Sequence, residues 1–298
     1  MNLAPACLFV YNRLNETRLT VAALRLNTLA SKTELFIFSD GAKNEDEIES
    51  VQDVRDFLIT IDGFQSVKII NSEINKGLAS SIISGVSDML MSYNQVIVLE
   101  DDLITAPNFL DFMNQALGFY NQYERVMSIS GFTFPIVLQK EYSFDAYFSY
   151  RTFSWGWATW KDRWFDIDWE ISDYKGFLDN RKLQIEFNRG GDDLCRMLKK
   201  QMNKEIDSWA IRFCYHQYRK DRLTVTPTIS KVRNIGFNKE GTHTKGKSRA
   251  YKTILDAGDL SAFSFPSTIE VNNEINKQFR FYFSKYYKIK HRLLDYFS

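Results

Sequence analysis

The sequence predicts an α/β protein built on a mostly parallel sheet that is flanked by helices. Short apolar runs alternate with longer amphipathic segments through the first third of the 298 residues. Strands separated in this way pair in parallel, because a parallel pair needs a long crossover connection such as a helix. One run, residues 96–99, is apolar at every position, which is typical of a strand buried on both faces of a parallel sheet.

The expected elements alternate regularly up to Pro107. In each helix, apolar residues recur every three or four positions, so that one face can pack on a sheet; in the first helix that face carries Leu19, Ala23 and Leu26. Strands are expected at residues 6–11, 35–38, 67–70 and 96–99, and helices at 17–28, 46–60 and 77–93.

The pattern is less regular in the rest of the chain. The mixture of helical and β-like segments there indicates a smaller mixed region beside the sheet. We expect a helix at 109–123, a strand at 126–130, helical structure at 180–222, β structure at 223–229 and a glycine-containing loop at 235–247.

Charge and cysteine content exclude some classes of protein. Lys and Arg number 38 against 37 Asp and Glu, so no net charge points to a nucleic-acid partner. Cys7, Cys195 and Cys214 share no metal or redox spacing, and we interpret them as buried thiols in a reducing compartment. No signal peptide and no apolar run of about 18 residues is visible, so we expect a cytoplasmic protein.

Polar side chains follow the expected strands where each strand ends. Asn12 and Arg13 follow the first strand, Asp40 follows the second, and the acidic triplet at residues 100–102 (Glu-Asp-Asp) follows the fourth. The carboxyl ends of parallel strands meet at one edge, where α/β sheets bind ligands. We interpret Asp40 as an acceptor for the imide N–H of a nucleobase, and Asn12 and Arg13 as contacts to ribose or phosphate. Loop capping is the alternative for each.

The acidic triplet suggests a divalent cation. Adjacent carboxylates repel one another, and Mn²⁺ or Mg²⁺ prefers oxygen ligands. The alternative is a solvated acidic turn. No Gly-rich phosphate loop with Lys-Ser/Thr is present and no Gly-x-Gly-x-x-Gly follows the first strand, which argues against P-loop NTPases and NAD enzymes.

Several short motifs follow one another along the chain: Asn12-Arg13, Asp40, residues 75–78 with Lys76 and Gly77, residues 98–102, 106–109, 150–153, 207–212 and 227–230. In this order they resemble the motifs of GT-A glycosyltransferases. The triplet followed by a Pro-x-Phe helix start is similar to the N-acetylglucosaminyltransferase I family, and the resemblance spans roughly residues 5–247. The Asn-Lys-Gly-Leu stretch also resembles bacterial capsule and O-antigen sugar transferases.

The resemblance implies a metal-dependent, inverting glycosyltransferase. It implies transfer of a sugar, N-acetylhexosamine by analogy, from a UDP-sugar to a hydroxyl of a glycan or lipid-linked saccharide in bacterial surface polysaccharide synthesis. Asp102 takes the role of the ligand to Mn²⁺ or Mg²⁺, Asp101 acts through ribose or metal-bound water, and Glu100 contacts the sugar hydroxyls. Lys76 and Gly77 match a donor-binding motif.

Asp207 matches the catalytic base of that family. It would take the proton of the acceptor hydroxyl, which attacks the anomeric carbon from the far side. Ser208 stands where the family has a second Asp, so Glu205 is the alternative base, and a helix N-cap is the structural alternative for Asp207.

Two further regions carry candidate contacts. Gly241, Thr242 and His243 lie in a loop that can close over a diphosphate, although an exposed loop histidine is the alternative. Trp155 is the candidate for a sugar pocket, since aromatic faces pair with the C–H faces of sugars. The helical spacing of Trp157, Trp160 and Trp164 instead predicts core positions, and His216 is expected to be structural.

We expect one continuous domain with a C-terminal extension. The extension carries a basic aromatic segment, residues 276–298, that suits an anionic membrane surface; packing on its own domain or on a second subunit is the alternative. The parts are a nucleotide-sugar-binding half at 1–125, an acceptor-side half at 126–250 and the extension at 251–298.

Two other classes of protein compete with a transferase. A sugar nucleotidyltransferase shares the α/β plan but needs a Gly-rich basic loop after the first strand, where this chain has Asn12-Arg13. A non-catalytic nucleotide- or carbohydrate-binding protein would use the tryptophans without turnover. The sequence leaves the donor sugar, the acceptor and the oligomeric state open.

Overall fold

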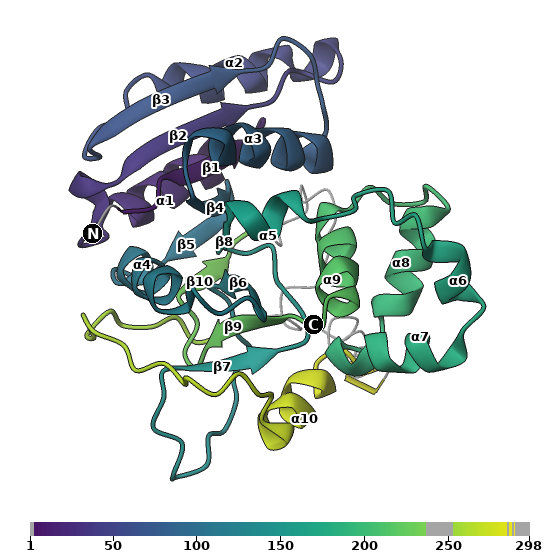
Figure 1. Ribbon diagram of the computed structural model, residues 1–298. Coiled ribbons are helices and arrows are strands. Elements are labelled where there is room, and N and C mark those ends of the chain that lie inside the picture. The colour runs from purple at the N-terminus through teal and green to yellow at the C-terminus, as the bar shows by residue number, and fades with distance from the viewer. Residues whose placement is uncertain (1–2, 237–252, 285, 288, 290–298) are drawn as a thin grey trace.

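The computed structural model describes residues 3–236, 253–284, 286–287 and 289, and it is organised around an eight-stranded sheet (Figure 1). The strand order is β3-β2-β1-β4-β8-β6-β9-β7. Six strands run in one direction, whereas β7 and β8 run in the other. The strands are β1 (Ala6–Val10), β2 (Glu34–Ser39), β3 (Ser66–Asn71), β4 (Gln95–Glu100), β6 (Val126–Ser130), β7 (Ala146–Ser149), β8 (Trp157–Trp160) and β9 (Leu223–Pro227).

A second, two-stranded sheet lies beside the first. It pairs β5 (Leu103–Thr105), which follows β4 directly, with β10 (Val232–Asn234) in antiparallel register. The helices are α1 (Leu14–Arg25), α2 (Ile48–Leu58), α3 (Leu78–Ser92), α4 (Phe109–Tyr120), α5 (Lys161–Phe165), α6 (Tyr174–Leu178), α7 (Arg181–Phe187), α8 (Leu194–Met202), α9 (Trp209–Arg219) and α10 (Asn273–Phe281), with 3₁₀ turns at Ala30–Lys32, Glu45–Glu47 and Asn188–Gly190.

Helices cover both faces of the large sheet. On one face, α1, α2, α4 and α10 enclose the larger core; on the other, α3, α5 and α9 enclose a second core. Strand β4 serves both, because Ile97 and Leu99 point into the first core and Val96 and Val98 into the second. This arrangement explains the uninterrupted apolar run, and it confirms the predicted fold class of a mostly parallel sheet flanked by helices.

The prediction that Leu19, Ala23 and Leu26 form the buried face of the first helix is wrong. Leu19 and Leu26 are 53% and 74% exposed, whereas Thr20 and Leu24 are buried. Helix α1 lies against β5, and the Thr20 hydroxyl donates to Asp101 O and accepts from Leu103 N. Because of these two hydrogen bonds the polar side chain of Thr20 lies on the buried face of α1. A search for apolar periodicity does not find a buried face that includes a polar residue.

The tryptophans are core residues, as expected, but not on one helix. Trp157 and Trp160 belong to strand β8, and only Trp164 lies on a helix, α5. Residues three apart on a strand point to opposite faces, so Trp157 joins the core under α9 while Trp160 joins the other. The region 180–222 is likewise divided into α7, α8 and α9, with a small core of its own among α6, α7, α8 and α9.

The cysteines carry no disulfide. Cys7 and Cys214 are buried and Cys195 is half-buried, on β1, α9 and α8 respectively. Burial in an apolar environment raises the pKa of the Cys7 thiol far above its ordinary value.

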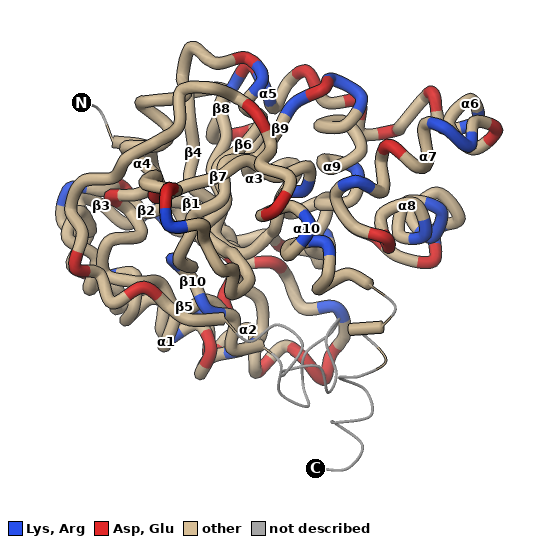
Figure 2. The backbone as a smooth tube through the Cα atoms, turned by 90° about the horizontal axis from the view of Figure 1, so that it is seen from below, with Lys and Arg blue, Asp and Glu red and all other residues tan. Residues whose placement is uncertain are grey.

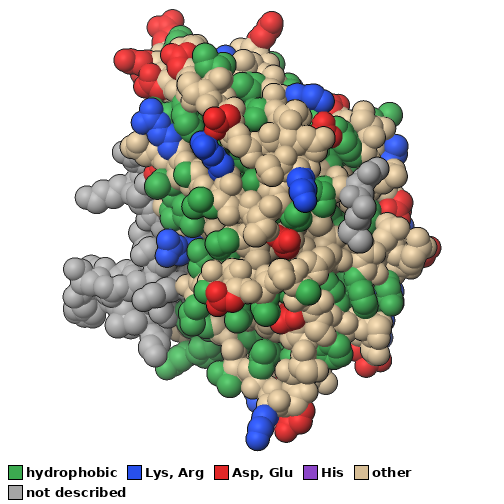
Figure 3. Space-filling view, turned by 90° about the vertical axis from the view of Figure 1, so that its left-hand side faces the viewer, with side chains coloured by type: hydrophobic (Ala, Val, Ile, Leu, Met, Phe, Trp, Pro, Cys, Tyr) green, Lys and Arg blue, Asp and Glu red, His purple; other side chains and the backbone are tan. Residues whose placement is uncertain are grey.

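The described part of the C-terminal segment packs on its own domain. Ile275 and Phe279 of α10 are buried, and the Phe283 ring lies 5.6 Å from that of Phe134. Phe281 and Tyr286 stay exposed. No helix among the described residues is long and apolar enough to cross a membrane. Charges of both signs are interspersed along the described backbone (Figure 2), and hydrophobic side chains are scattered among polar ones on the face seen in Figure 3.

Candidate active site

The acidic triplet and Arg13 meet because β1 and β4 are neighbouring parallel strands. Phe9 is the register partner of Glu100, so the chain segments that leave the two strands run side by side. The Asp101 and Asp102 side chains are almost completely enclosed, at 5% and 11% exposure, and that of Arg13 is 20% exposed. The polar strand ends predicted from the sequence therefore do converge at β1 and β4.

Arg13 bridges two carboxylates of the triplet. Its Nη2 donates to Asp101 Oδ1, and its Nη1 donates to Asp102 Oδ2 over 3.1 Å. Burial opposes the charge of the guanidinium, but the two carboxylates outweigh it and raise the pKa of Arg13. The planar fork of arginine suits this contact, since it reaches two anionic partners at once.

Glu100 is in a different environment from its two neighbours. Burial, followed by the charges of Asp102 and Asp101, raises the pKa of Glu100 to about 8, although Arg13 and Ser154 act in the opposite direction. Within the described part of the chain, Glu100 Oε1 is buried without a hydrogen-bond partner. At neutral pH the triplet thus carries less negative charge than its three carboxyl groups would suggest.

Asp101 is also shifted, though less. Burial raises the pKa of Asp101 to about 6, while Arg13 opposes the shift. The charge of Asp101 is therefore maintained chiefly by its contact with Arg13.

Asp102 is held from a second direction by β10. Asn234 Nδ2 donates to Asp102 Oδ1 over 3.1 Å, and the Ile235 amide donates to Asp102 O over 2.8 Å. Gly236 N in turn donates to Asn234 Oδ1. A Cβ atom at Gly236 would lie 2.1 Å from Asp102 Oδ2, so only glycine allows this approach. Asn234 was not predicted from the sequence, where its only signal is a polar residue two positions before a glycine.

The side chains at the triplet suit a hard cation that takes further ligands from elsewhere. Among the described residues, no group of three or more His, Cys, Asp or Glu is arranged to hold a metal ion by itself. Each oxygen of Asp102 accepts one hydrogen bond, which leaves each of them a second lone pair. With the unpartnered Glu100 Oε1, the protein therefore offers oxygen atoms of the kind that Mn²⁺ and Mg²⁺ prefer.

Asp40 organises a loop at the same edge of the sheet. Its Oδ1 accepts from Gly41 N and from Lys76 N (3.0 and 2.9 Å), and its Oδ2 accepts from Gly77 N (3.0 Å). Gly77 has a φ of 74°, which favours glycine. The structure thus brings together Asp40, Lys76 and Gly77, three residues that the sequence analysis selected separately, while a contact of Asp40 with a nucleobase stays a prediction.

Tyr11 and Asn12 share Glu47 as a partner. Tyr11 donates its hydroxyl hydrogen to Glu47 Oε2, and Asn12 Nδ2 donates to Glu47 Oε1 over 3.3 Å. Burial and the hydrogen bond to Glu47 raise the pKa of Tyr11 to about 12. Neither Tyr11 nor Glu47 was selected from the sequence, because the pairing depends on the 3₁₀ turn that brings Glu47 back to β1.

The two candidate bases precede α9. Trp209 stacks on Trp157 of β8 at 4.6 Å, and Trp157 is the register partner of Val98, so the start of α9 lies against the strand next to β4. The side chain of Asp207 is 62% exposed and accepts from Arg212 Nη2 over 3.2 Å. Glu205 is also exposed, with Lys200 at 3.7 Å.

The N-cap of α9 is Ser208, so that alternative for Asp207 is wrong. Ser208 Oγ accepts from Ile211 N, three residues into the helix. Trp155, the candidate for a sugar pocket, is half-buried, with its ring 4.5 Å from that of Phe132. Gly241, Thr242 and His243 lie outside the described residues.

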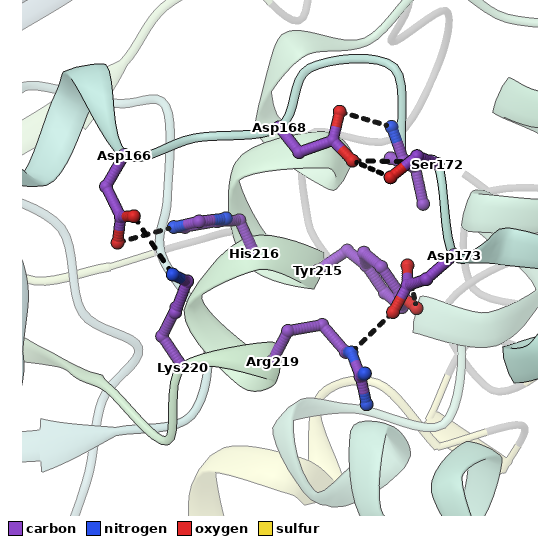
Figure 4. A pocket seen from close by; sticks show the side chains of 9 residues that line it. Asp166, Asp168, Ser172, Asp173, Tyr215, His216, Arg219 and Lys220 are labelled. Atoms are coloured by element: carbon purple, nitrogen blue, oxygen red, sulfur yellow. Dashed lines mark hydrogen bonds and ion pairs between the residues drawn. The ribbon is translucent and has the colours of Figure 1, made fainter.

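A separate cavity of about 310 Å³ lies elsewhere, between the segment after α5 and the last turns of α9 (Figure 4). None of the predicted site residues that the structure describes lines it. His216 lies there with its Nε2 3.4 Å from Asp166 Oδ2, and it is buried, in line with a structural role. Asp173 accepts from Tyr215 and pairs with Arg219, and Asp166 pairs with Lys220, so two of the three aspartates of the cavity wall already have a cationic partner. We therefore locate the candidate site at the triplet and not at this cavity.

Comparison with known proteins gives structural likenesses only. No family model matches the chain, and no curated protein matches it. Its structure is similar to those of glycosyltransferases. A mannosyltransferase from Pyrobaculum calidifontis, in complex with GDP-Man and Mn²⁺, has a TM-score of 0.36 and 10% identity, over 54% of this chain and 45% of that one.

Two further structures cover more of the chain. TarS (1-349) from S. aureus has a TM-score of 0.41 and 9% identity over 78% of this chain and 60% of that one. An active-site mutant of LgtC has a TM-score of 0.37 and 8% identity over 71% of this chain and 69% of that one. The chain thus spans less than two thirds of the mannosyltransferase and of TarS (1-349).

Proposed function

We propose that the protein is a GT-A glycosyltransferase that moves a sugar from a nucleoside diphosphate sugar, a UDP-N-acetylhexosamine by analogy, to a hydroxyl of a glycan or lipid-linked saccharide. The observation that carries the proposal is the enclosed acidic triplet at the carboxyl end of β4, with Arg13 from the end of β1 across two of its carboxylates. This edge of a parallel sheet is where α/β proteins bind nucleotides.

The residues at this edge divide the work of binding a donor. Asp102 would hold Mn²⁺ or Mg²⁺, which would supply positive charge to the diphosphate as it leaves, and Glu100 would contact the sugar hydroxyls. Arg13 donates hydrogen bonds to phosphate oxygens, and the loop fixed by Asp40 presents Lys76 and Gly77 to the donor.

Asp207 is the proposed general base. Its carboxylate is exposed at the start of α9, so an acceptor hydroxyl can reach it and transfer a proton as the oxygen attacks the anomeric carbon. Attack from the side opposite to the diphosphate inverts the configuration at that carbon. Arg212 Nη2 donates to Asp207 Oδ1 over 3.2 Å, and this contact directs the carboxylate.

Turnover tests this assignment. UDP-sugars incubated with the protein and Mn²⁺ are expected to release UDP slowly by hydrolysis, and the sugar that is hydrolysed fastest identifies the donor. Asp207→Asn is expected to retain UDP binding and to lose transfer to an added acceptor. Near-wild-type transfer by Asp207→Asn would reassign the base to Glu205, and UDP binding without any turnover would make the protein a non-catalytic binding protein.

We also propose that the enzyme works at an anionic membrane surface, as a lipid-linked acceptor requires. Phe281, Tyr286 and Ile289 remain exposed, and so does Lys277, which precedes Phe281 by four residues on α10. Aromatic side chains beside lysine suit the interface of an anionic bilayer. Co-sedimentation with vesicles that contain phosphatidylglycerol, compared with neutral vesicles, tests this, and a triple Phe281→Ser, Tyr286→Ser, Ile289→Ser variant that binds as tightly as wild type would refute it.

A further inference from the structure

Arg13 lies against Asp102, the proposed metal ligand, and also against Asp101. Its guanidinium contacts one oxygen of each carboxylate, and both carboxylates are nearly enclosed. Two cations within about 4 Å of each other repel strongly wherever water is scarce. A divalent cation bound to Asp102 would therefore compete with the guanidinium of Arg13, which lies 3.1 Å from Asp102 Oδ2.

The backbone at Arg13 is anchored in the first turn of α1, whereas its side chain is the most exposed of the three charged groups. Arg13 O accepts from Thr17 N (3.0 Å) and from Thr17 Oγ1 (2.7 Å). The side chain is 20% exposed, against 5% and 11% for Asp101 and Asp102. A ligand that arrives from solvent therefore meets the guanidinium more readily than it meets the two carboxylates.

A nucleoside diphosphate would give Arg13 a second anionic partner at the same edge of the sheet. Guanidinium binds phosphate through two parallel hydrogen bonds, as it binds carboxylate. The diphosphate also brings the additional oxygen ligands that the described residues do not supply in a group of three.

We propose that Arg13 is an exchangeable counter-ion of the acidic triplet: it neutralises Asp101 and Asp102 in the free protein and transfers to the diphosphate when nucleotide and a divalent cation bind together. The part of this inference that concerns the nucleotide rests on the proposed function. The exchange of Arg13 makes metal binding conditional on nucleotide, so that the free protein does not take up a cation in the absence of a donor.

Titration of Mn²⁺ alone, without nucleotide, tests the competition directly. The concentration of free Mn²⁺ is followed by its electron paramagnetic resonance signal, for wild type and for Arg13→Gln. Removal of the positive charge is expected to tighten the binding of Mn²⁺ alone at least about ten-fold. Arg25→Gln, which removes a surface arginine paired with Asp62, is the matched control and should bind Mn²⁺ like wild type.

The reciprocal titration uses UDP at saturating Mn²⁺. Arg13→Gln is expected to bind UDP at least about ten-fold more weakly than wild type, because the diphosphate loses the guanidinium that would bind it. Should Arg13→Gln fail to fold, Arg13→Met keeps the length of the side chain and replaces it in both titrations.

Two results overturn the inference separately from the function. Equal affinity of wild type and the Arg13 variants for Mn²⁺ alone would refute the competition, whatever UDP does. Tighter Mn²⁺ binding by the variants, together with no binding of UDP to any protein at any Mn²⁺ concentration, would keep the competition but refute the transfer to a diphosphate and the proposed function with it.

Discussion

Asn234 Nδ2 lies 3.1 Å from Asp102 Oδ1, although 132 residues separate the two along the chain. The contact exists because β10 pairs with β5, the strand that begins immediately after the triplet. The second half of the chain thereby fixes the direction of a carboxylate that the first half supplies.

Replacement of this amide should weaken donor binding without unfolding the protein. Asn234→Ala removes a hydrogen bond to a charged group, a contribution of about 1.5–3 kcal/mol, so we expect UDP affinity in the presence of Mn²⁺ to fall at least about ten-fold. Asn234→Asp should be worse, because it places a carboxylate against Asp102. Calorimetry measures both; Gln52→Ala, which removes an exposed amide bonded to Asp56, is the control, and equal affinity of all four proteins would contradict this role.

Gly236 provides a steric test of the same contact. A methyl group at this position would lie 2.1 Å from Asp102 Oδ2, and the carboxylate has to move to admit it. We expect Gly236→Ala to abolish Mn²⁺-dependent UDP binding. Gly176→Ala in α6 is the matched control, because nothing lies within 4 Å of its added Cβ. That control should retain UDP binding and gain about 0.5–1 kcal/mol of stability in urea denaturation, as expected for glycine replaced inside a helix.

A buried ion pair holds the segment that follows residue 252 against the start of β10. Lys231 Nζ contacts Asp256 Oδ2, with side-chain exposures of only 3% and 10%. We expect Lys231→Met to lower the free energy of unfolding by about 3–5 kcal/mol, because it leaves the Asp256 charge buried without a counter-charge. Arg125→Met, which breaks the exposed pair with Asp221, should cost at most about 1 kcal/mol.

Urea denaturation of both variants measures this difference, and similar losses in the two would show that the Lys231 pair is not enclosed in solution. The double variant Lys231→Met, Asp256→Leu should recover most of the lost stability, since it removes both charges.

His216 predicts a pH dependence of stability. Burial lowers the pKa of His216 below its ordinary value of 6.5, although the neighbouring Asp166 opposes the shift; Lys220 and Arg222, which also contact Asp166, reinforce it. The unfolded chain therefore takes up a proton at a higher pH than the folded protein does. Stability from this group is complete above about pH 6.5 and is lost as the pH falls from there towards the folded pKa.

His216→Gln should remove the loss of stability that protonation of His216 causes below about pH 6.5. Unfolding free energies of wild type and variant, measured in urea from about pH 8 down to about pH 5, should converge as the pH falls. A constant difference between the two over this range would show that His216 does not titrate differently in the folded and unfolded states.

Much of the fold follows from local patterns in the sequence. The strands β1 to β4 alternate with helices as predicted, because apolar runs and crossover lengths restrict the possible pairings. The errors occur where long-range contacts override periodicity. Thr20 faces inward because it bonds to Asp101 and Leu103, and Trp157 and Trp160 lie on a strand because Trp157 pairs with Val98 and Ser130.

In the candidate site, too, some residues could be predicted from local patterns and others could not. Arg13 and the triplet were predictable, since the ends of neighbouring parallel strands must meet. Asn234, Glu47 and Gly236 were not, because each reaches the site through a turn or an antiparallel pair whose register no local pattern specifies.

The most direct test of the account is calorimetric titration of UDP into wild type and Asp102→Asn, each with and without Mn²⁺. We expect wild type to bind UDP at least about ten-fold more tightly with Mn²⁺, and Asp102→Asn to lose this dependence while remaining folded. Binding of UDP that ignores both Mn²⁺ and the Asp102→Asn substitution would contradict the assignment of the triplet as the centre of a metal-dependent glycosyltransferase.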